Sequence, residues 1–395
     1  LSFNVSLTLS KWFLNMDFDL PEETRMLQDV VRRFVDDELM PLEQSLPDRP
    51  NSLDLPHDIK KRLVSMIESM GLAALDAPVE IGGAGLGLLD SCIVIEQIHR
   101  CTAGRGVFAM RFAPVLYDLG TDDQKEKYLY PTVRGELQGA SAFSEPQAAG
   151  DLAGIQTTME KNSGGWVLNG SKCWISYADI ADYVLVLARQ KGTTRHEGMT
   201  WVIVDTGTPG FSLGREQKMI HGHSTFELFL EDCHVPDEQL LGEPGKGWGA
   251  GTSFLYSSRL QISARALGIA DRCLELAIDY AKQRQTFGKP LASRQAIQWM
   301  IAESSIDLHA ARLMVYEAAL RAQNGEQVIQ QTAMAKTFAT EMVGRVVDRA
   351  VQIHGAAGLS DETILERCYR DVRPMRIYEG SAEAMRSVIA NDLLR

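Results

Sequence analysis

The chain has 395 residues, of which 45% are hydrophobic and 23% charged, a balance typical of a globular protein with a large core. This composition excludes an intrinsically disordered, a collagenous or a disulfide-scaffold protein. Lys and Arg total 40 and Asp and Glu total 52, so the net charge is -12; such a surface repels phosphates, and we expect no nucleic acid as the main partner.

Two further properties narrow the class of protein. No apolar run reaches the roughly 18 residues of a membrane-spanning helix, so no membrane span is expected. The 6 cysteines form no C-x-x-C pair, and none of them stands at zinc-ligand spacing from a His. We therefore expect reduced, mostly buried thiols and no metal site. At about 150 residues per domain, the length predicts two or three domains.

Residues 1–15 are interpreted as a tag or an upstream extension, with Met16 as the natural start. This segment begins without Met and carries a single charge, on Lys11. It lacks the Arg-rich amphipathic pattern of a transit peptide and a clear signal-cleavage site.

Residues 16–137 are predicted to form an N-terminal α domain. Pro21 suits the first turn of a helix, and apolar residues then recur at spacings of three and four along 27–35. Further amphipathic runs cover 59–70 and 88–99, with a glycine-dense loop at 78–87 between them.

Residues 138–244 are predicted to form a middle antiparallel β domain. Asn169 and Gly170 lie between two apolar runs, a pattern that predicts a tight hairpin turn. Further strands are expected at 183–188, 200–204 and 226–230, which are β-rich and bounded by Gly, Pro and Asp.

Residues 245–395 are predicted to form a C-terminal antiparallel helix bundle. Long periodic runs at 258–283, 295–323 and 331–354 are joined by short connections. The fold class expected is therefore α+β: helices, then an antiparallel sheet, then a bundle. No G-x-G-x-x-G, Walker A, G-x-S-x-G or H-E-x-x-H motif occurs, so a nucleotide cofactor is not held by a familiar phosphate loop.

Four segments together resemble the acyl-CoA dehydrogenase family. They are F-S-E-P at 143–146, followed by Q-A-A-G-D; K-C-W-I-S at 172–176; R-Q-T-F-G at 284–288, followed by Q-A-I; and Q-I-H-G-A-A-G at 352–358, followed by R-D and I-Y-E-G at 377–380. Each segment alone is weak, but their order and spacing cover nearly the whole chain.

The resemblance implies a flavoenzyme of fatty-acid β-oxidation type that binds FAD between the β domain and the bundle. Such enzymes take a proton from Cα and a hydride from Cβ of an acyl-CoA thioester and leave a trans-2-enoyl-CoA. It further implies electron-transfer flavoprotein as the acceptor, and a homotetramer in which Arg and Gln of one subunit reach the FAD of its neighbour. The expected location is the bacterial cytoplasm, with the mitochondrial matrix as the alternative.

By the same resemblance, Glu379 is the catalytic base. A Cα–H beside a thioester is a weak acid, and burial raises the pKa of a carboxyl and makes it a stronger base. The alternative is a solvated surface carboxylate. Some members carry the base on a helix of the C-terminal domain, but the matching residue here is Ser258, which cannot act as a base.

The remaining expected site residues also follow from the resemblance. Trp174 and Ser176, two apart on a strand, are expected to share a face against the flavin; the alternative for Trp174 is an ordinary core residue. The alternative for Arg284 is an exposed Arg that favours the negative end of a helix dipole. The alternative for Gln352 is a role in capping the end of a helix. The FAD-binding set is Phe143, Ser144, Trp174, Ser176, Arg284, Thr286, Phe287, Gln295, Gln352, Gly355 and Ser381. The substrate-binding set is Gly150, Arg259, Tyr378 and Gly380.

Three departures from the family pattern leave the acyl group open. Gly150 stands where the family has a Ser that contacts CoA, and Tyr256 where some members carry an Asp. His221 and His223 are also unusual, and a hydrogen-bonded or solvated pair is favoured over a metal site.

The competing functions are an acyl-CoA oxidase, a nitroalkane oxidase, which uses Asp as base, a flavin-containing nucleic-acid-binding relative, and an inactive scaffold.

Overall fold

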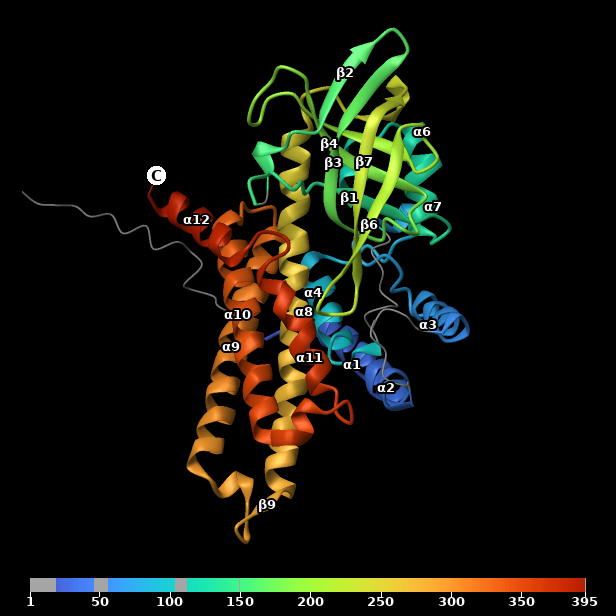
Figure 1. Ribbon diagram of the computed structural model, residues 1–395. Helices are drawn as coiled ribbons and strands as arrows, with labels where there is room; N and C mark the ends of the chain where they lie inside the picture. Colours follow the sequence, from blue (N-terminus) through green and yellow to red (C-terminus); the bar gives the residue numbers. More distant parts are fainter. Residues whose placement is uncertain (1–18, 46–55, 104–111, 149, 395) are drawn as a thin grey trace, which may run out of the picture.

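The computed structural model describes residues 19–45, 56–103, 112–148 and 150–394. A helical part comes first, then a β-sheet part, then a bundle of long helices, as Figure 1 shows. This arrangement confirms the predicted fold class. Residues 1–15, interpreted as an extension, lie outside the described residues.

The N-terminal part is built from short helices. They are α1 (Glu22–Phe34), continued by one π-helical turn (Val35–Leu39), α2 (Met40–Ser45), α3 (His57–Ser69), α4 (Leu88–Ile98), α5 (Pro114–Leu119), α6 (Asp122–Gln124), a second π-helical turn (Lys125–Leu129) and α7 (Tyr130–Val133). The helix predicted after Pro21 is confirmed, because α1 begins at Glu22. Val31 and Phe34 are buried against α3 and α4, but Val30 is exposed, so the apolar face is narrower than predicted.

The middle part is one sheet whose strands pair in the order β6-β7-β3-β2-β4-β5-β8, with β1 beside β4. Most pairs are antiparallel, as predicted, but β1 and β2 both pair with β4 in parallel. The two faces of β4 pack in different cores, one of which contains side chains of α5 and α7. The strands are β1 (Gly139–Ala142), β2 (Thr158–Asn162), β3 (Gly165–Ser176), β4 (Tyr183–Gln190), β5 (Met199–Asp205), β6 (Phe211–Lys218), β7 (Ser224–Val235) and β8 (Leu240–Leu241).

The hairpin turn predicted at Asn169 and Gly170 is wrong. β3 runs straight through both residues, and the turn between β2 and β3 lies at 163–164 instead. The pairing of β3 with β7 shifts register between Leu168 and Gly170. A Cβ at Gly170 would lie 2.5 Å from Thr157 Oγ1. Glycine is therefore present because another backbone approaches closely, not because the chain turns.

The C-terminal part is an antiparallel bundle, as predicted. Its helices are α8 (Gly247–Gln283), α9 (Gln295–Gln323), α10 (Ile329–His354), α11 (Leu365–Val372) and α12 (Ala382–Leu393), and a small hairpin of β9 (Gln285–Thr286) and β10 (Lys289–Pro290) joins α8 to α9. Helix α8 begins well before the predicted Ser258. Its first residue is fixed on the sheet, because the Trp201 indole N–H donates to the Gly247 carbonyl at 3.0 Å.

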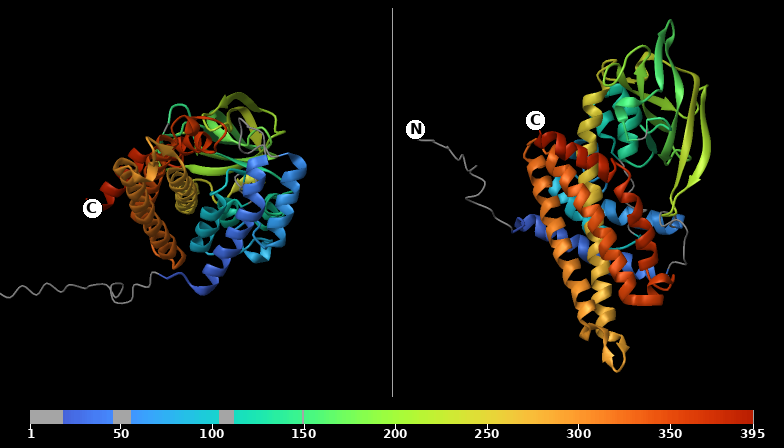
Figure 2. Two further views of the ribbon diagram at one scale, coloured as in Figure 1. Left: turned by 90° about the horizontal axis from the view of Figure 1, so that it is seen from below. Right: turned by 60° about the vertical axis from the view of Figure 1, so that its left-hand side comes forward.

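Helix α8 contacts all three parts of the molecule. It begins at the sheet, packs along α4, α9 and α10, and ends at the β9–β10 hairpin at the opposite end of the molecule, as Figures 1 and 2 show. The residues on α8 are therefore distributed along the whole bundle. Within the described ranges, none of the helices combines the length and the apolar character that a membrane crossing requires.

Candidate active site

Glu379 lies in a strained loop between α11 and α12. Its φ is +54° and that of Gly380 is +94°; a left-handed conformation is unusual for a residue with a long side chain and costs about 1–3 kcal/mol. Two cations hold this loop. Arg259 Nε donates to the Glu379 carbonyl at 3.0 Å, and Lys336 Nζ donates to the Gly380 carbonyl at 2.6 Å.

The two cations reach the loop from different helices, Arg259 from α8 and Lys336 from α10. Lys336 is completely buried. Burial, with the nearby Arg259 charge, lowers the pKa of Lys336 to about 8. The sequence reasoning missed this residue, although Lys336 continues a buried helix face at spacings of three and four with Thr332, Ala333 and Thr340. A lysine at a core position is the signal that would have found it.

One oxygen of the Glu379 carboxyl is removed from water. Its Oε2 atom is buried and has no hydrogen-bond partner among the described residues. Burial raises the pKa of Glu379 above its usual value, opposed by the Arg259 charge, a hydrogen bond with the Ser258 side chain and the charges of Lys336 and Arg265. A carboxyl with a raised pKa is a stronger base once it has lost its proton.

The end of β3 faces the same stretch of α8. The pairing of β3 with β7 is irregular between Lys172 and Ile175, and Trp174 there has a φ of +61°. The Trp174 side chain is 54% exposed, so the alternative of an ordinary core residue is wrong. Arg265 of α8 acts electrostatically on both Glu379 and Tyr177, which follows Ser176. Arg265 therefore lies within electrostatic reach of both the β3 end and the Glu379 loop, and the candidate site is the region between them.

Phe143 and Ser144 lie beside the same β3 end. The Cys173 N–H donates to the Ser144 carbonyl at 3.0 Å, which connects the segment after β1 to β3. The Phe143 ring packs edge-on against Trp201, with ring centroids 4.9 Å apart. The structure thus brings together four of the predicted FAD-binding residues, those at 143, 144, 174 and 176.

A buried ion pair fixes the β3 end, and the sequence reasoning missed it. Lys172 Nζ lies 2.8 Å from Glu145 Oε1, and both side chains are excluded from solvent. The same Nζ donates to the carbonyls of Phe143 at 3.2 Å and Leu187 at 2.7 Å. Burial lowers the pKa of Lys172 to about 8. Glu145 also accepts a hydrogen bond from the Thr157 N–H at 3.0 Å. The sequence did contain a signal for this pair, because both residues belong to the segments that resemble the family, at 143–146 and 172–176.

A second group of predicted FAD-binding residues lies at the far end of the bundle. Arg284, Thr286 and Phe287 belong to the β9–β10 hairpin, and Gln295 begins α9 (Figure 1). Gln352 and Gly355 end α10 near this hairpin, where the neighbouring His354 stacks on a ring of α8. Along α8 the distance from Arg259 to this end is about 36 Å at 1.5 Å per residue, so one chain does not bring the two groups together.

The other predicted residues have mixed surroundings. The Ser381 hydroxyl caps α12 by accepting from the Ala384 N–H at 3.2 Å. Gly150 has open space at its Cβ position, and Tyr378 is partly buried against the bundle core. The His221 and His223 rings lie 5.8 Å apart, and Tyr177 packs on His223. Among the described residues no group of His, Cys, Asp and Glu could hold a metal ion.

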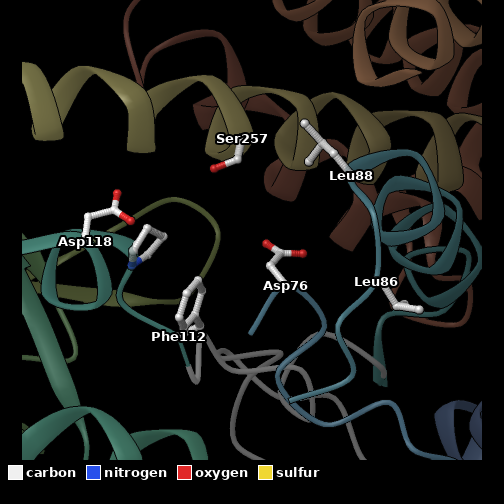
Figure 3. A pocket seen from close by; sticks show the side chains of 7 residues that line it. Asp76, Leu86, Leu88, Phe112, Asp118 and Ser257 are labelled. Atoms are coloured by element: carbon white, nitrogen blue, oxygen red, sulfur yellow. The ribbon is translucent and has the colours of Figure 1, made fainter. Parts of the chain in front are cut away.

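A cavity of about 290 Å³ adjoins the site between α8 and the N-terminal part (Figure 3). Ser257, the neighbour of Ser258, lines it from α8, and Asp76 and Asp118 line it from the opposite side. Burial raises the pKa of both carboxyls, and Gln261 donates to Asp76.

The arrangement fits a flat, largely apolar ring system bound against the β3 end. Trp174 offers an exposed indole face, with the Ser176 hydroxyl two residues on. The Glu379 loop provides a carboxyl whose Oε2 atom has no hydrogen-bond partner among the described residues. A substrate held between the ring system and this carboxyl would meet a base on one side and an electron acceptor on the other.

Comparisons with known proteins agree with this geometry. Models of the N-terminal, middle and C-terminal domains of acyl-CoA dehydrogenase match residues 21–136, 140–233 and 245–394. The human mitochondrial short-chain specific acyl-CoA dehydrogenase is 37% identical over 95% of this chain and 91% of its own. Acryloyl-CoA reductase (NADH) of Anaerotignum propionicum is 36% identical over 96% of both chains. The structure of butyryl-CoA dehydrogenase from Megasphaera elsdenii superposes with a TM-score of 0.85 at 33% identity, covering 96% of this chain and 100% of that one.

Proposed function

Because the chain belongs to the acyl-CoA dehydrogenase family, whose members are FAD flavoproteins, we propose that Glu379 is the base that removes the Cα proton of an acyl-CoA thioester. The product of this reaction is a trans-2-enoyl-CoA. The observation that carries the proposal is the Glu379 carboxyl itself, whose Oε2 atom is buried without a hydrogen-bond partner and whose pKa is raised by burial.

Glu379 accepts the Cα proton through its unpartnered oxygen. Ser258, Arg259 and Lys336 hold the carboxyl and its loop in place, and their polar contacts also lower its pKa. The burial that raises the pKa dominates, so the ionised carboxylate is a stronger base than a carboxylate in water.

The negative charge that develops on the thioester oxygen needs a hydrogen-bond donor. We assign the backbone N–H of Glu379 to this role. Arg259 and Lys336 bind the carbonyls of Glu379 and Gly380 and so fix the left-handed backbone that orients this N–H. Such a donor is fixed before the reaction begins, which is what makes it effective.

FAD bound at this site would supply the acceptor for the hydride that leaves Cβ. Phe143, Ser144, Trp174 and Ser176 are proposed to hold its ring system. Trp174 supplies apolar area, and the Ser176 hydroxyl donates a hydrogen bond to a ring edge. Electron-transfer flavoprotein is the proposed acceptor.

The remaining predicted residues keep their proposed roles. The proposed contacts on the thioester side are Gly150, Tyr378 and Gly380, and Ser381 is proposed to bind FAD. The domain boundaries near 137 and 244 stay predictions.

A homo-oligomer, and specifically a tetramer, is proposed because the two groups of FAD-binding residues lie at opposite ends of one chain. Arg284 and Gln295 are solvent-exposed, and Phe287 is 97% exposed. Helix α9 also exposes an apolar residue at every seventh position, the spacing of a helix–helix seam: Trp299, Ile306, Leu313 and Leu320. A second copy that covers this face would bring its own hairpin toward the first copy's candidate site.

Replacing Arg284 by Ala is expected to weaken FAD retention by about 10-fold or more, because a guanidinium binds phosphate oxygens through charged hydrogen bonds. Acyl-CoA affinity of the FAD-loaded enzyme should change much less. The measurement is the FAD dissociation constant of purified protein, with Lys289→Ala on the same hairpin as the matched control. A larger loss of acyl-CoA affinity than of FAD affinity would remove Arg284 from the FAD site.

The proposed function is tested by anaerobic flavin reduction. The purified protein should be yellow, and an accepted acyl-CoA added without air should bleach the flavin absorbance. Admission of air separates a dehydrogenase, which stays bleached for minutes or longer, from an oxidase, which recovers its colour quickly. No bleaching across a wide panel of straight, branched and cyclic acyl-CoAs would refute acyl-CoA dehydrogenation.

A further inference from the structure

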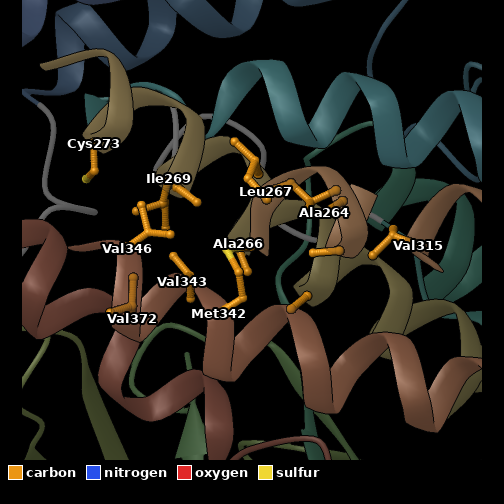
Figure 4. Close-up of a cluster of buried hydrophobic side chains, with 14 of the residues drawn as sticks. Ala264, Ala266, Leu267, Ile269, Cys273, Val315, Met342, Val343, Val346 and Val372 are labelled. Carbon is orange, nitrogen blue, oxygen red and sulfur yellow. The ribbon is translucent and has the colours of Figure 1, made fainter. Parts of the chain in front are cut away.

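Arg265 is a cation within an otherwise apolar stretch of α8. The residues next to it in the chain belong to the buried core shown in Figure 4: Ala264, Ala266, Leu267 and Ile269. Arg265 itself is partly buried, and its Nε atom is shielded from solvent without a hydrogen-bond partner. In the described parts of the chain, no carboxylate forms an ion pair with it.

The guanidinium belongs to the face of α8 that contacts the Glu379 loop through Ser258. Arg265 follows Ser258 by seven residues, so both lie on one face of α8, about 10.5 Å apart along its axis. Helical side chains lean toward the N-terminus, which brings the guanidinium back toward the level of Ser258. Its electrostatic action on both Glu379 and Tyr177 agrees with a position near both the β3 end and the Glu379 loop.

Positive charge is in excess around Glu379. Arg259 and Lys336 donate hydrogen bonds to backbone carbonyls of the Glu379 loop, whereas Arg265 Nε has no hydrogen-bond partner among the described residues. Three cations therefore act on the Glu379 carboxyl, and Glu383, which acts on Lys336, offsets only one of them. An arginine cannot lose its proton in a protein, and a partly buried guanidinium without a partner is unfavourable. The site lacks an anion that a ligand can supply.

The chemistry of the reactants narrows the source of this anion. The thioester and the oxidised flavin ring are neutral. The charge of FAD lies on its pyrophosphate, for which Arg284 is the proposed partner, and the phosphates of CoA are separated from the thioester by the whole pantetheine arm. The acyl group is what extends from the thioester past Glu379. We propose that Arg265 binds a carboxylate at the far end of the acyl group, so that the preferred substrates are short dicarboxylic acyl-CoAs; this inference rests on the proposed dehydrogenation.

The planar guanidinium suits this role, because it can donate two parallel hydrogen bonds to one carboxylate. The substrate carboxylate would also neutralise the positive charge of the Arg265 guanidinium. An acyl group that ends in a methyl group would instead leave the guanidinium unpaired. Discrimination between the two therefore comes from a single residue.

The test compares glutaryl-CoA with butyryl-CoA on the FAD-loaded enzyme, first in wild type and then in Arg265→Gln. Wild type should bleach with glutaryl-CoA at a kcat/KM at least equal to that with butyryl-CoA. Arg265→Gln should lower kcat/KM for glutaryl-CoA by about 10-fold to 150-fold, the range for a lost charged hydrogen bond, and change butyryl-CoA by less than about 3-fold. Arg265→Lys should lose less, and Arg272→Gln, two turns further along α8, should change neither.

Binding without turnover gives an independent measurement. In a Glu379→Gln background, glutaryl-CoA perturbs the flavin spectrum without reacting, and adding Arg265→Gln should raise its dissociation constant by a similar factor. Equal losses for both acyl-CoAs, or loss of FAD from Arg265→Gln, would overturn the inference, the latter by assigning the guanidinium to the cofactor. Bleaching by butyryl-CoA and not by glutaryl-CoA would overturn it while leaving the proposed function intact; bleaching by neither, nor by any other acyl-CoA, would refute both.

Discussion

Glu379→Gln is expected to retain FAD and to lose at least about 10²-fold in turnover, the contribution typical of a positioned general base. Gln keeps the shape of Glu and its hydrogen bond with Ser258, but its amide cannot accept the Cα proton. The backbone of the loop should stay in place, because Arg259 and Lys336 bind carbonyls and not the carboxylate. The measurement is the rate of anaerobic flavin reduction at saturating acyl-CoA.

The matched control is Glu383→Gln, four residues further on, where the carboxyl is exposed in the first turn of α12. This variant should reduce its flavin at the wild-type rate. In wild type, kcat/KM should fall as the pH drops through the raised pKa of Glu379, because the protonated acid cannot act as a base; this acid limb therefore lies above the usual pKa of 4.5. Near-normal reduction by Glu379→Gln would assign the base to another residue.

Lys172→Met is expected to lower the free energy of unfolding by about 3–5 kcal/mol, the cost typical of removing one partner from a buried ion pair. The change leaves the Glu145 carboxylate buried without its counter-charge, and it removes the donor to the carbonyls of Phe143 and Leu187. The measurement is denaturant unfolding. FAD retention should also fall, because Lys172 ties Phe143 to β3.

Lys191→Met provides the control, because Lys191 pairs with Glu160 at 2.7 Å but both side chains are exposed. Such a pair contributes little in water, so this variant should unfold at the wild-type denaturant concentration. Lys172→Met combined with Glu145→Gln should recover part of the loss, because the buried charge is then gone. A Lys172→Met protein as stable as the control would show that the pair contributes nothing to the fold.

Periodicity predicted the order of the parts and most of their elements, because burial imposes a period of two on strands and about 3.6 on helices. It failed where position in space decides the outcome. Asn169 and Gly170 suit a turn, yet a neighbouring strand makes the glycine part of a continuous β3. Helix α8 begins inside the segment 245–395 predicted to be helical, but eleven residues before its predicted periodic run, since its first turn is fixed by contact with Trp201 rather than by its own apolar pattern.

The candidate site divides in the same way. The resemblance assigned Glu379 and the residues of the β3 end, because these stand in short motifs that can be read along the chain. Lys336 and the pair of Lys172 and Glu145 were not assigned, because their roles depend on partners far away in sequence.

The sequence alone determined the α+β layout, the family and the candidate base, since local patterns and short motifs carry that information. The tertiary structure decided which charges surround the base and which one lacks a partner. It also separated Arg284 from Glu379 by most of the length of α8. These properties depend on the distances between elements remote in sequence, and on the water that their packing removes from charged groups.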